Sequence, residues 1–239
     1  MTDPSVGSPD GSPQPTAAGI PFVCLILAAG RSRRFGAATK QLAELDGRPL
    51  IEHAVQVAVD AGASRVMVVV GHDGERVGAA ARVAGAAAGT PVEIVVNADH
   101  AAGQSTSLVA GLRALATRAS ADPASDEPDD ARADDPPGGR SDPIAVLLAD
   151  QPHIDPVTVT AVVAAVAAGA EAARVRYLDA VAHPVAFAWS LVPRLRTVEG
   201  DVGARELLRR IDTVEVVHDT PVPLDVDTPA DLRRLAREI

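Results

Sequence analysis

The chain has 239 residues, 32 acidic against 22 basic side chains, and a formal net charge of −10. This length allows one domain or a small pair, and 47% hydrophobic residues are enough for a packed core, which excludes disorder of the whole chain. The acidic balance argues against a nucleic-acid scaffold. The single Cys24 excludes an intramolecular disulfide framework and a cysteine-based zinc cluster. Because no apolar stretch reaches the roughly 18 residues of a membrane span and no signal-peptide pattern occurs, we expect a cytoplasmic protein without a membrane partner.

The negative charge is concentrated in two polar segments. Residues 1–20 are rich in Gly, Pro and Ser, carry two acids and no base, and are predicted to be a disordered tail. Residues 120–142 carry eight acids and two bases and are predicted to be a disordered acidic insertion. The rest of 21–239, which we expect to form a single domain, is therefore nearly neutral. An anionic ligand is compatible with it, although nothing favours nucleic acid.

Apolar runs alternate with helical periodicity along this domain. Continuous apolar runs that end at Gly or Asp predict buried parallel strands, and apolar positions at helical spacing predict helices. In chain order we predict strand 21–29, helix 49–62, strand 65–71, helix 75–85, strand 91–97, helix 104–117, strand 143–150, helix 156–169, strand 183–188, a helical turn at 190–198, helix 202–211, strand 214–219 and helix 229–239. The alternation predicts an α/β fold with a doubly wound, mostly parallel sheet. Ligands of such sheets bind beyond the carboxyl ends of the strands, which directs attention to 30–40, 71–73, 97–107 and 150–153.

A loop rich in glycine and arginine follows the first predicted strand. Gly30 and Gly36 allow the backbone to approach a ligand, and free amide groups there can bind phosphate oxygens. Three arginines at 31–34 and Lys40, the only lysine of the chain, supply matching positive charge. The segment is neither a Walker A loop nor a G-x-G-x-x-G dinucleotide motif, and the alternative interpretation is a solvated basic turn.

Carboxylates follow the fourth predicted strand and precede the last predicted helix. Asp150 ends the strand, and Asp225 and Asp227 share one side of their segment if it is extended. Mg²⁺ usually binds one or two carboxylates together with phosphate oxygens and water, so these residues are candidate metal ligands. The alternatives are capping roles, in which Asp150 caps the next turn and Asp227 caps the helix opened by Pro229.

The polar segment 103–107 opens a predicted helix. Its side chains suit hydrogen bonds to a base or a ribose, and the alternative is that Ser105 or Thr106 caps the helix.

The segment Leu27–Leu42, LAAGRSRRFGAATKQL, resembles the nucleotide-binding signature of the MobA-like nucleotidyltransferases. The resemblance covers nearly all of 22–239 apart from the insertion, and implies a Rossmann-like nucleotidyltransferase fold with three α/β/α layers. Within the family the chain is most similar to the molybdenum cofactor cytidylyltransferases. Members with LAAG resemble CTP users and members with LAGG resemble GTP users, so Ala29 implies CTP. Further matching blocks, in order, are GRPLIEHAV (47–55), NADHAAGQSTSLVAGL (97–112), LLADQP (147–152), HPVAF (183–187), GDVGARELL (200–208) and LDVDTPADL (224–232).

The resemblance also implies roles for individual residues. Arg34 and the amides near Gly30 would hold the β- and γ-phosphates, and Lys40 would stabilise charge that develops on the α-phosphate. Asp150 and Asp227 would bind Mg²⁺. The residues implied to contact the nucleotide are Leu27, Ala28, Ala29, Gly30, Arg31, Ser32, Gly36, Gln104, Ser105 and Ser107.

The second half of the chain is expected to bind the acceptor, with His183 and Asp201 as candidate contacts. The alternatives are a hydrogen-bonded core histidine for His183 and a turn or cap role for Asp201. The chain departs from the family pattern here, because Ala182 stands where glycine is common before His-Pro. Val109 likewise stands where the family often has arginine.

The expected reaction is in-line attack of an acceptor phosphate on the α-phosphorus of CTP, with CMP transferred and pyrophosphate released. The resemblance implies a molybdopterin-type acceptor, and a molybdenum hydroxylase apoprotein as a possible protein partner. Two alternative functions remain open at this point. One is an NAD(P)H-dependent oxidoreductase similar to nicotine blue oxidoreductase, and the other is a non-catalytic molybdenum cofactor chaperone for a molybdenum hydroxylase.

Overall fold

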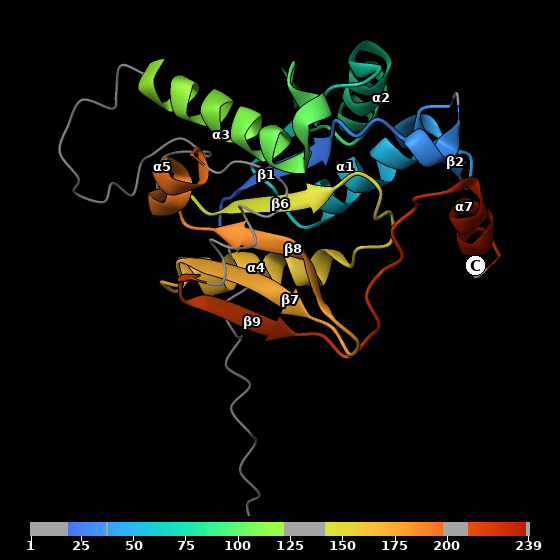
Figure 1. The fold of residues 1–239 in the computed structure, drawn as a ribbon. Coiled ribbons are helices and arrows are strands. Elements are labelled where there is room, and N and C mark those ends of the chain that lie inside the picture. Colours follow the sequence, from blue (N-terminus) through green and yellow to red (C-terminus); the bar gives the residue numbers. More distant parts are fainter. Residues whose placement is uncertain (1–18, 37, 122–141, 198–209, 238–239) are drawn as a thin grey trace, which may run out of the picture.

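The computed structural model describes residues 19–36, 38–121, 142–197 and 210–237. Within these ranges one seven-stranded sheet consists of β1 (Val23–Ala28), β4 (Arg65–Val70), β5 (Val92–Val96), β6 (Ile144–Leu148), β7 (Ala172–Arg176), β8 (Val181–Phe187) and β9 (Thr213–Val217). The order across the sheet is β5-β4-β1-β6-β8-β7-β9 (Figure 1). Only β8 runs antiparallel to its neighbours in this sheet. The predicted doubly wound, mostly parallel sheet is therefore confirmed.

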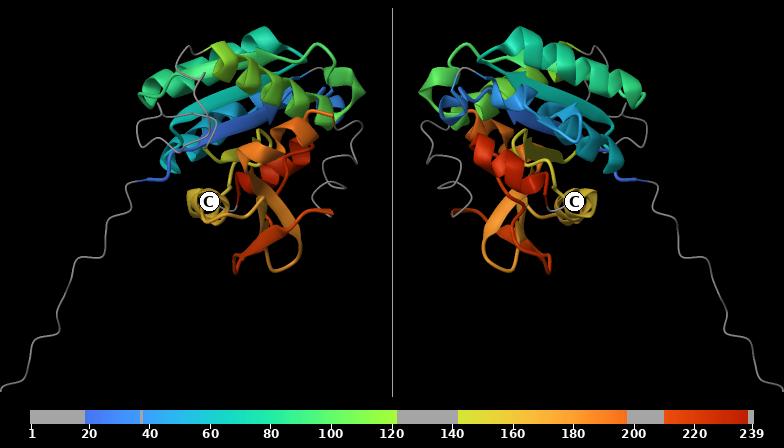
Figure 2. Two further views of the ribbon diagram at one scale, coloured as in Figure 1. Left: turned by 90° about the vertical axis from the view of Figure 1, so that its left-hand side faces the viewer. Right: turned by 90° about the vertical axis from the view of Figure 1, so that its right-hand side faces the viewer.

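Helices cover both faces of the sheet, as the three-layer prediction requires. On one face lie α1 (Leu50–Asp60), α2 (Gly74–Ala87) and α4 (Pro156–Ala167), and on the other lie α3 (Gln104–Ala121) and α5 (Val192–Leu195). Side chains along β1 alternate between the two faces of the sheet, so the strand packs against both helical layers. Cys24 and Ile26 pack against the first layer, and Val23 and Leu25 pack against the second. Figure 2 shows the same layers from two sides.

A third apolar cluster brings the last helix against the beginning of the domain. It joins α7 (Pro229–Leu235) to the short hairpin of β2 (Glu44–Leu45) and β3 (Arg48–Pro49), through Phe35, Leu45, Leu50, Val226 and Leu235. Thr228 caps α7 in a capping box with Asp231. Thr228, and not Asp227, is therefore the helix cap, and the capping alternative for Asp227 is wrong.

Several predicted boundaries differ from the observed ones. Strand β7 was not predicted, because Ala172-Ala173-Arg174-Val175-Arg176 lacks the apolar run of the other central strands; pairing with β8 and β9 makes it a strand. The hairpin β2–β3 was also not predicted. Helix α3 extends to Ala121, and Asp142 is buried. The predicted insertion 120–142 therefore overlaps ordered structure at both of its ends.

Other predictions lie outside the described residues. These are the tail up to residue 18, the insertion over 122–141, and all but the last two residues of helix 202–211. The helical turn predicted at 190–198 corresponds to η5 (Trp189–Leu191) followed by α5. In the part of the chain that the structure describes, no helix combines the length and apolar character of a membrane crossing.

Candidate active site

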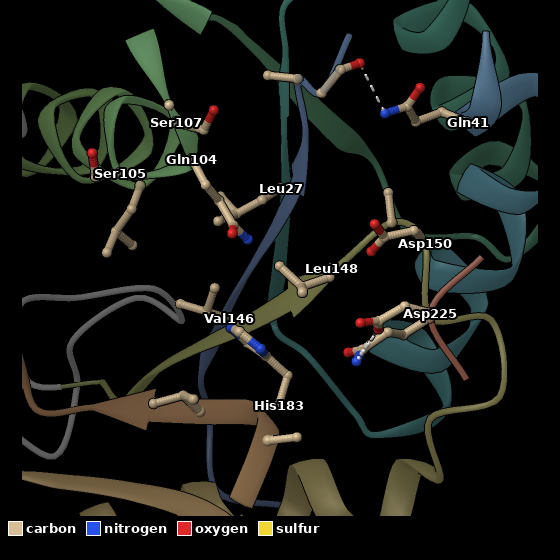
Figure 3. Close-up of a pocket in the computed structure, with 18 of the residues that line it drawn as sticks. Leu27, Gln41, Gln104, Ser105, Ser107, Val146, Leu148, Asp150, His183 and Asp225 are labelled. Atoms are coloured by element: carbon tan, nitrogen blue, oxygen red, sulfur yellow. Dashed lines mark hydrogen bonds between the residues drawn. The ribbon is translucent and has the colours of Figure 1, made fainter. Parts of the chain in front are cut away.

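A pocket of about 1000 Å³ lies beyond the carboxyl ends of β1 and β6. At this point the sheet order reverses, because β4 and β5 lie on one side of β1 whereas β6 and the later strands lie on the other. The segments that follow β1 and β6 therefore diverge and leave a crevice, which is where open α/β sheets bind ligands. In the close-up, the carboxylates of Asp150 and Asp225 lie on one side, and the start of α3 lies on another (Figure 3).

The loop after β1 is held in shape by side-chain hydrogen bonds. Ser32 has a left-handed backbone conformation (φ 52°), and its hydroxyl accepts a hydrogen bond of 3.0 Å from the Lys40 backbone amide. The same hydroxyl donates to Gln41 Oε1 at 3.2 Å, and Gln41 Nε2 donates to the Gly30 carbonyl at 3.3 Å. The two ends of the loop are thereby tied together, and Lys40 is directed into the pocket.

The predicted nucleotide contacts of this loop divide into two groups. Ala28 is buried in β1 and packs into the core, whereas Gly36 is exposed. Neither of them lines the pocket, and nor does Arg34. The predicted residues that do line it here are Leu27, Ala29, Gly30, Arg31, Ser32 and Lys40.

Lys40 forms hydrogen bonds to both carboxylates that were predicted to be metal ligands, Asp150 and Asp227. Its Nζ donates to Asp150 Oδ2 at 2.7 Å and to Asp227 Oδ1 at 3.0 Å. Burial alone would lower the pKa of Lys40, but attraction to Asp150 and the hydrogen bonds to both carboxylates together raise it. Lys40 is therefore a cation at neutral pH. Arg34 reaches Asp227 Oδ2 at 2.8 Å from the outside, with 71% of its side chain exposed.

Asp225 is a third carboxylate of the pocket, although the family resemblance implied Asp227 as the metal ligand. Gln151 Nε2 donates to Asp225 Oδ1 at 2.6 Å, and the Val226 amide donates to the Asp150 carbonyl at 2.8 Å. This backbone bond places the 225–227 segment against the end of β6. Burial and the nearby Asp150 carboxylate raise the pKa of Asp225. The Asp-x-Asp spacing was the signal that could have included it.

The donor set fits a hard divalent cation. Asp150 and Asp227 both contact Lys40 Nζ, so the two carboxylates lie close to each other in the pocket. Over the described ranges, no group of three or more His, Cys, Asp or Glu side chains is arranged to hold a metal. Two carboxylates completed by substrate phosphates and water are the ligand set that Mg²⁺ typically uses in nucleotide sites.

The start of α3 forms the opposite wall. Asn97, the only asparagine, donates through Nδ2 to Thr106 Oγ1 at 2.9 Å and to Ser107 Oγ at 3.0 Å. Thr106 Oγ1 bonds to the Gly103 carbonyl, and the buried Ser105 Oγ has no hydrogen-bond partner. The helix begins at Gln104, before both residues, so the capping alternative for Ser105 and Thr106 is wrong. A buried hydroxyl without a partner is rare in folded proteins and marks this part of the pocket wall as unusual.

Of the two residues predicted to contact the acceptor, the structure brings His183 into the pocket. A register shift lies opposite it: Arg174 pairs with Val185 and Val175 pairs with Ala182, so His183 and the next residue are inserted between pairs. Such bulges turn a side chain toward a site. In Figure 3 the ring points into the cavity toward Val146. Asp201 lies outside the described residues.

Comparison with known proteins shows the family of the chain. Residues 24–214 match the model of the MobA-like NTP transferase domain. The chain belongs to this family. As a MobA-like NTP transferase it is a nucleotidyltransferase, and the matched residues include Lys40 and Asp150 but end before Asp225 and Asp227. Nicotine blue oxidoreductase of Paenarthrobacter nicotinovorans is 29% identical over 222 residues, which are 88% of this chain and 94% of that protein.

Solved structures share the fold over almost the whole MobA-like chain. Rv0371c of Mycobacterium tuberculosis H37Rv matches with a TM-score of 0.69 and 28% identity, covering 92% of this chain and 98% of that one. Its complex with manganese matches with a TM-score of 0.66 and 27% identity, covering 92% and 100%. A nucleotidyl transferase from Methanothermobacter thermautotroptrophicus, with a TM-score of 0.65, 21% identity and coverage of 92% and 98%, shows the same fold.

Proposed function

We propose that this MobA-like protein transfers CMP from CTP to a phosphate-bearing acceptor, a molybdopterin-type molybdenum cofactor, and releases pyrophosphate. The observation that carries the proposal is the convergence of Lys40, Asp150 and Asp227 beside the glycine loop. This combination of a point positive charge and two hard oxygen donors suits a triphosphate with its metal ion. No nucleophilic side chain is needed, because the attacking oxygen belongs to the acceptor.

In the proposed reaction an acceptor phosphate oxygen forms a bond to the α-phosphorus of CTP. The bond from that phosphorus to the oxygen bridging to the β-phosphate breaks, and pyrophosphate leaves. Lys40 stabilises the charge that builds on the α-phosphate, while the loop amides near Gly30 and the side chain of Arg31 hold the leaving group. These residues act by position and charge. Mg²⁺ held by Asp150 and Asp227 would neutralise triphosphate charge.

The preference for CTP rests on Ala29. This residue is 4% exposed and lines the pocket at the nucleotide end. Its methyl group occupies space that the glycine of LAGG sequences leaves free, and the resemblance associates alanine with CTP. For the metal, the manganese complex of Rv0371c supports a divalent cation, and the oxygen ligands support Mg²⁺.

A second candidate is an NAD(P)H-dependent oxidoreductase. The observation that favours it is the similarity to nicotine blue oxidoreductase over 88% of this chain. Against it stands the Lys40–Asp150–Asp227 arrangement, which hydride transfer does not require. A chaperone for a molybdenum hydroxylase would need to bind the molybdenum cofactor but would catalyse neither reaction.

One assay separates these functions. Purified protein is incubated with Mg²⁺, a molybdopterin-type acceptor and CTP, GTP or ATP, and pyrophosphate release is measured. We expect release with CTP at least roughly tenfold faster than with GTP, because one methyl group in a pocket changes selectivity by about this factor. Faster release with GTP would contradict the role of Ala29. No release, combined with NADPH oxidation in the presence of a dye, would establish the second candidate; acceptor binding without either reaction would favour the chaperone.

A further inference from the structure

The acceptor side of the pocket has a different surface from the carboxylate side. Val146 of β6, Val185 of β8, Arg174 of β7 and Glu215 of β9 are register partners and form one row across four strands. The first three line the pocket. The part of the row that lines the pocket therefore consists of two adjacent apolar side chains followed by the guanidinium group of Arg174.

Arg174 is held firmly but retains donors. Its Nε and Nη2 donate to Glu215 Oε1 at 3.1 and 2.6 Å, and Arg176 donates to the other oxygen of the same carboxylate. Two cations share one anion, so the group keeps a net positive charge. The hydrogen bonds from Arg174 chiefly, and those from Arg176, lower the pKa of Glu215, which stays ionised at neutral pH. Among the described residues, Nη1 of Arg174 donates to none, and its two N–H groups remain for a ligand.

The separation between Arg174 and the reacting centre at Asp150 sets the minimum length of a ligand that contacts both. Asp150 lies in the turn that follows β6, beyond the end of the strand that carries Val146, and Arg174 lies two strands across the sheet from Val146, roughly 10 Å away. A free phosphate at Asp150 cannot reach Arg174. A molecule that touches both must carry an extended body. Between them, Val146 and Val185, which are 3% and 7% exposed, form part of an apolar pocket floor.

We propose that Arg174 is a specificity-determining residue that binds the end of the acceptor remote from its reacting phosphate. In the acceptor of the proposed function, the face of the fused ring system would lie against Val146 and Val185, and its rim would present carbonyl oxygen or ring nitrogen to Nη1 of Arg174. Glu215 is the positioning residue that orients the guanidinium. The inference rests on the proposed function, since that function places the reacting phosphate at Asp150.

The chain offers a matched control in Arg65. This residue of β4 donates from Nε and Nη2 to Glu93 of β5 at 2.6 and 3.1 Å, an Arg–Glu pair across neighbouring strands like that of Arg174. The Arg65 side chain is 21% exposed and that of Arg174 is 29% exposed. Arg65 does not line the pocket. Arg65→Met and Arg174→Met thus each remove two hydrogen bonds to a cross-strand glutamate, and only the second alters the pocket.

The first measurement is transfer kinetics with the molybdopterin-type acceptor and CTP. We expect Arg174→Met to raise the KM for the acceptor roughly 10- to 100-fold, the effect of losing a charged hydrogen bond, with the KM for CTP unchanged. Arg174→Lys keeps the charge but loses the planar fork, and should recover only part of the loss. Arg65→Met should match the unmodified protein. Equal acceptor KM values for Arg174→Met and Arg65→Met would overturn the proposal.

The second measurement does not depend on catalysis. Fluorescence titration with 6-hydroxymethylpterin, a flat ring system without phosphate, should show binding to the unmodified protein and to Arg65→Met. Binding to Arg174→Met should be weaker by a similar factor. If the unmodified protein and Arg65→Met bind the pterin more tightly than Arg174→Met does, but no pyrophosphate is released, the proposed function fails while the assignment of Arg174 stands. Absence of pterin binding, or equal binding to all three proteins, would refute the assignment.

Discussion

The two ends of the pocket are built in different ways. At one end Lys40, Asp150 and Asp227 come from three segments distant in the sequence, and Lys40 donates a hydrogen bond to each of the two carboxylates. At the other end Arg174 and its neighbours belong to adjacent strands, and their positions follow from the register of the sheet. The charged end suits chemistry common to any nucleoside triphosphate. The residues around Arg174 can differ between proteins with different acceptors without disturbing that chemistry. Substitutions at the two ends of the pocket should therefore have different effects.

The largest effect should come from Lys40→Met. Removal of the cation leaves Asp150 and Asp227 facing each other and leaves the α-phosphate without its stabilising charge. We expect kcat to fall about 10²- to 10³-fold, the scale seen when one preorganised donor is lost. Pyrophosphate release measures this, with Lys40→Arg as a control that keeps the charge but not its compact geometry. Turnover within tenfold of the unmodified protein would show that Lys40 is structural only.

A comparison of Asp150→Asn with Asp225→Asn tests which carboxylates hold the metal. Both substitutions are isosteric and lie in the same pocket wall. Asp150→Asn should reduce turnover about 10²-fold and raise the Mg²⁺ concentration needed, because a metal ligand is lost. Asp225→Asn should cost less than about tenfold, because its partner Gln151 can still donate to an amide oxygen. The measurement is pyrophosphate release as a function of Mg²⁺, and a larger loss at Asp225 would reverse the assignment.

Ala29→Gly should change nucleotide preference and leave the acceptor end unaffected. Loss of the methyl group enlarges the nucleotide end, and we expect the ratio of kcat/KM for CTP over GTP to fall roughly tenfold. Competition between the two nucleotides measures the ratio. The acceptor KM should not change, and an altered acceptor KM would mean that the two ends are not independent.

The smallest effect should be the pH-dependent stability contributed by Asp231. Hydrogen bonds from Thr228, first its hydroxyl, hold the pKa of this carboxyl below its usual value of 3.8. The stabilisation is therefore complete above that value and disappears as pH falls through the lower folded pKa. Asp231→Ala should lose about 1 kcal/mol at pH 7, a fall of about 2–4 °C in Tm. Thermal unfolding at pH 7 and pH 3 measures the difference, which should shrink at the lower pH.

The amino-acid sequence alone determined the doubly wound sheet and most of its elements. Long apolar runs such as 65–71 specify buried strands because burial on both faces admits few other side chains. It also identified the glycine loop, Lys40 and Asp150, since strand ends of an α/β sheet are where ligands bind. Those inferences use only local pattern and the position of a residue after a strand.

Only the tertiary structure decided which side chains meet. Lys40 contacts partners 110 and 187 residues away, and no local pattern encodes a pairing of that range. Strand β7 owes its conformation to its neighbours, so Arg174 became a pocket residue only when the sheet assembled. The physical reason is that periodicity reports which face of an element is buried, whereas register and loop packing determine what lies opposite it.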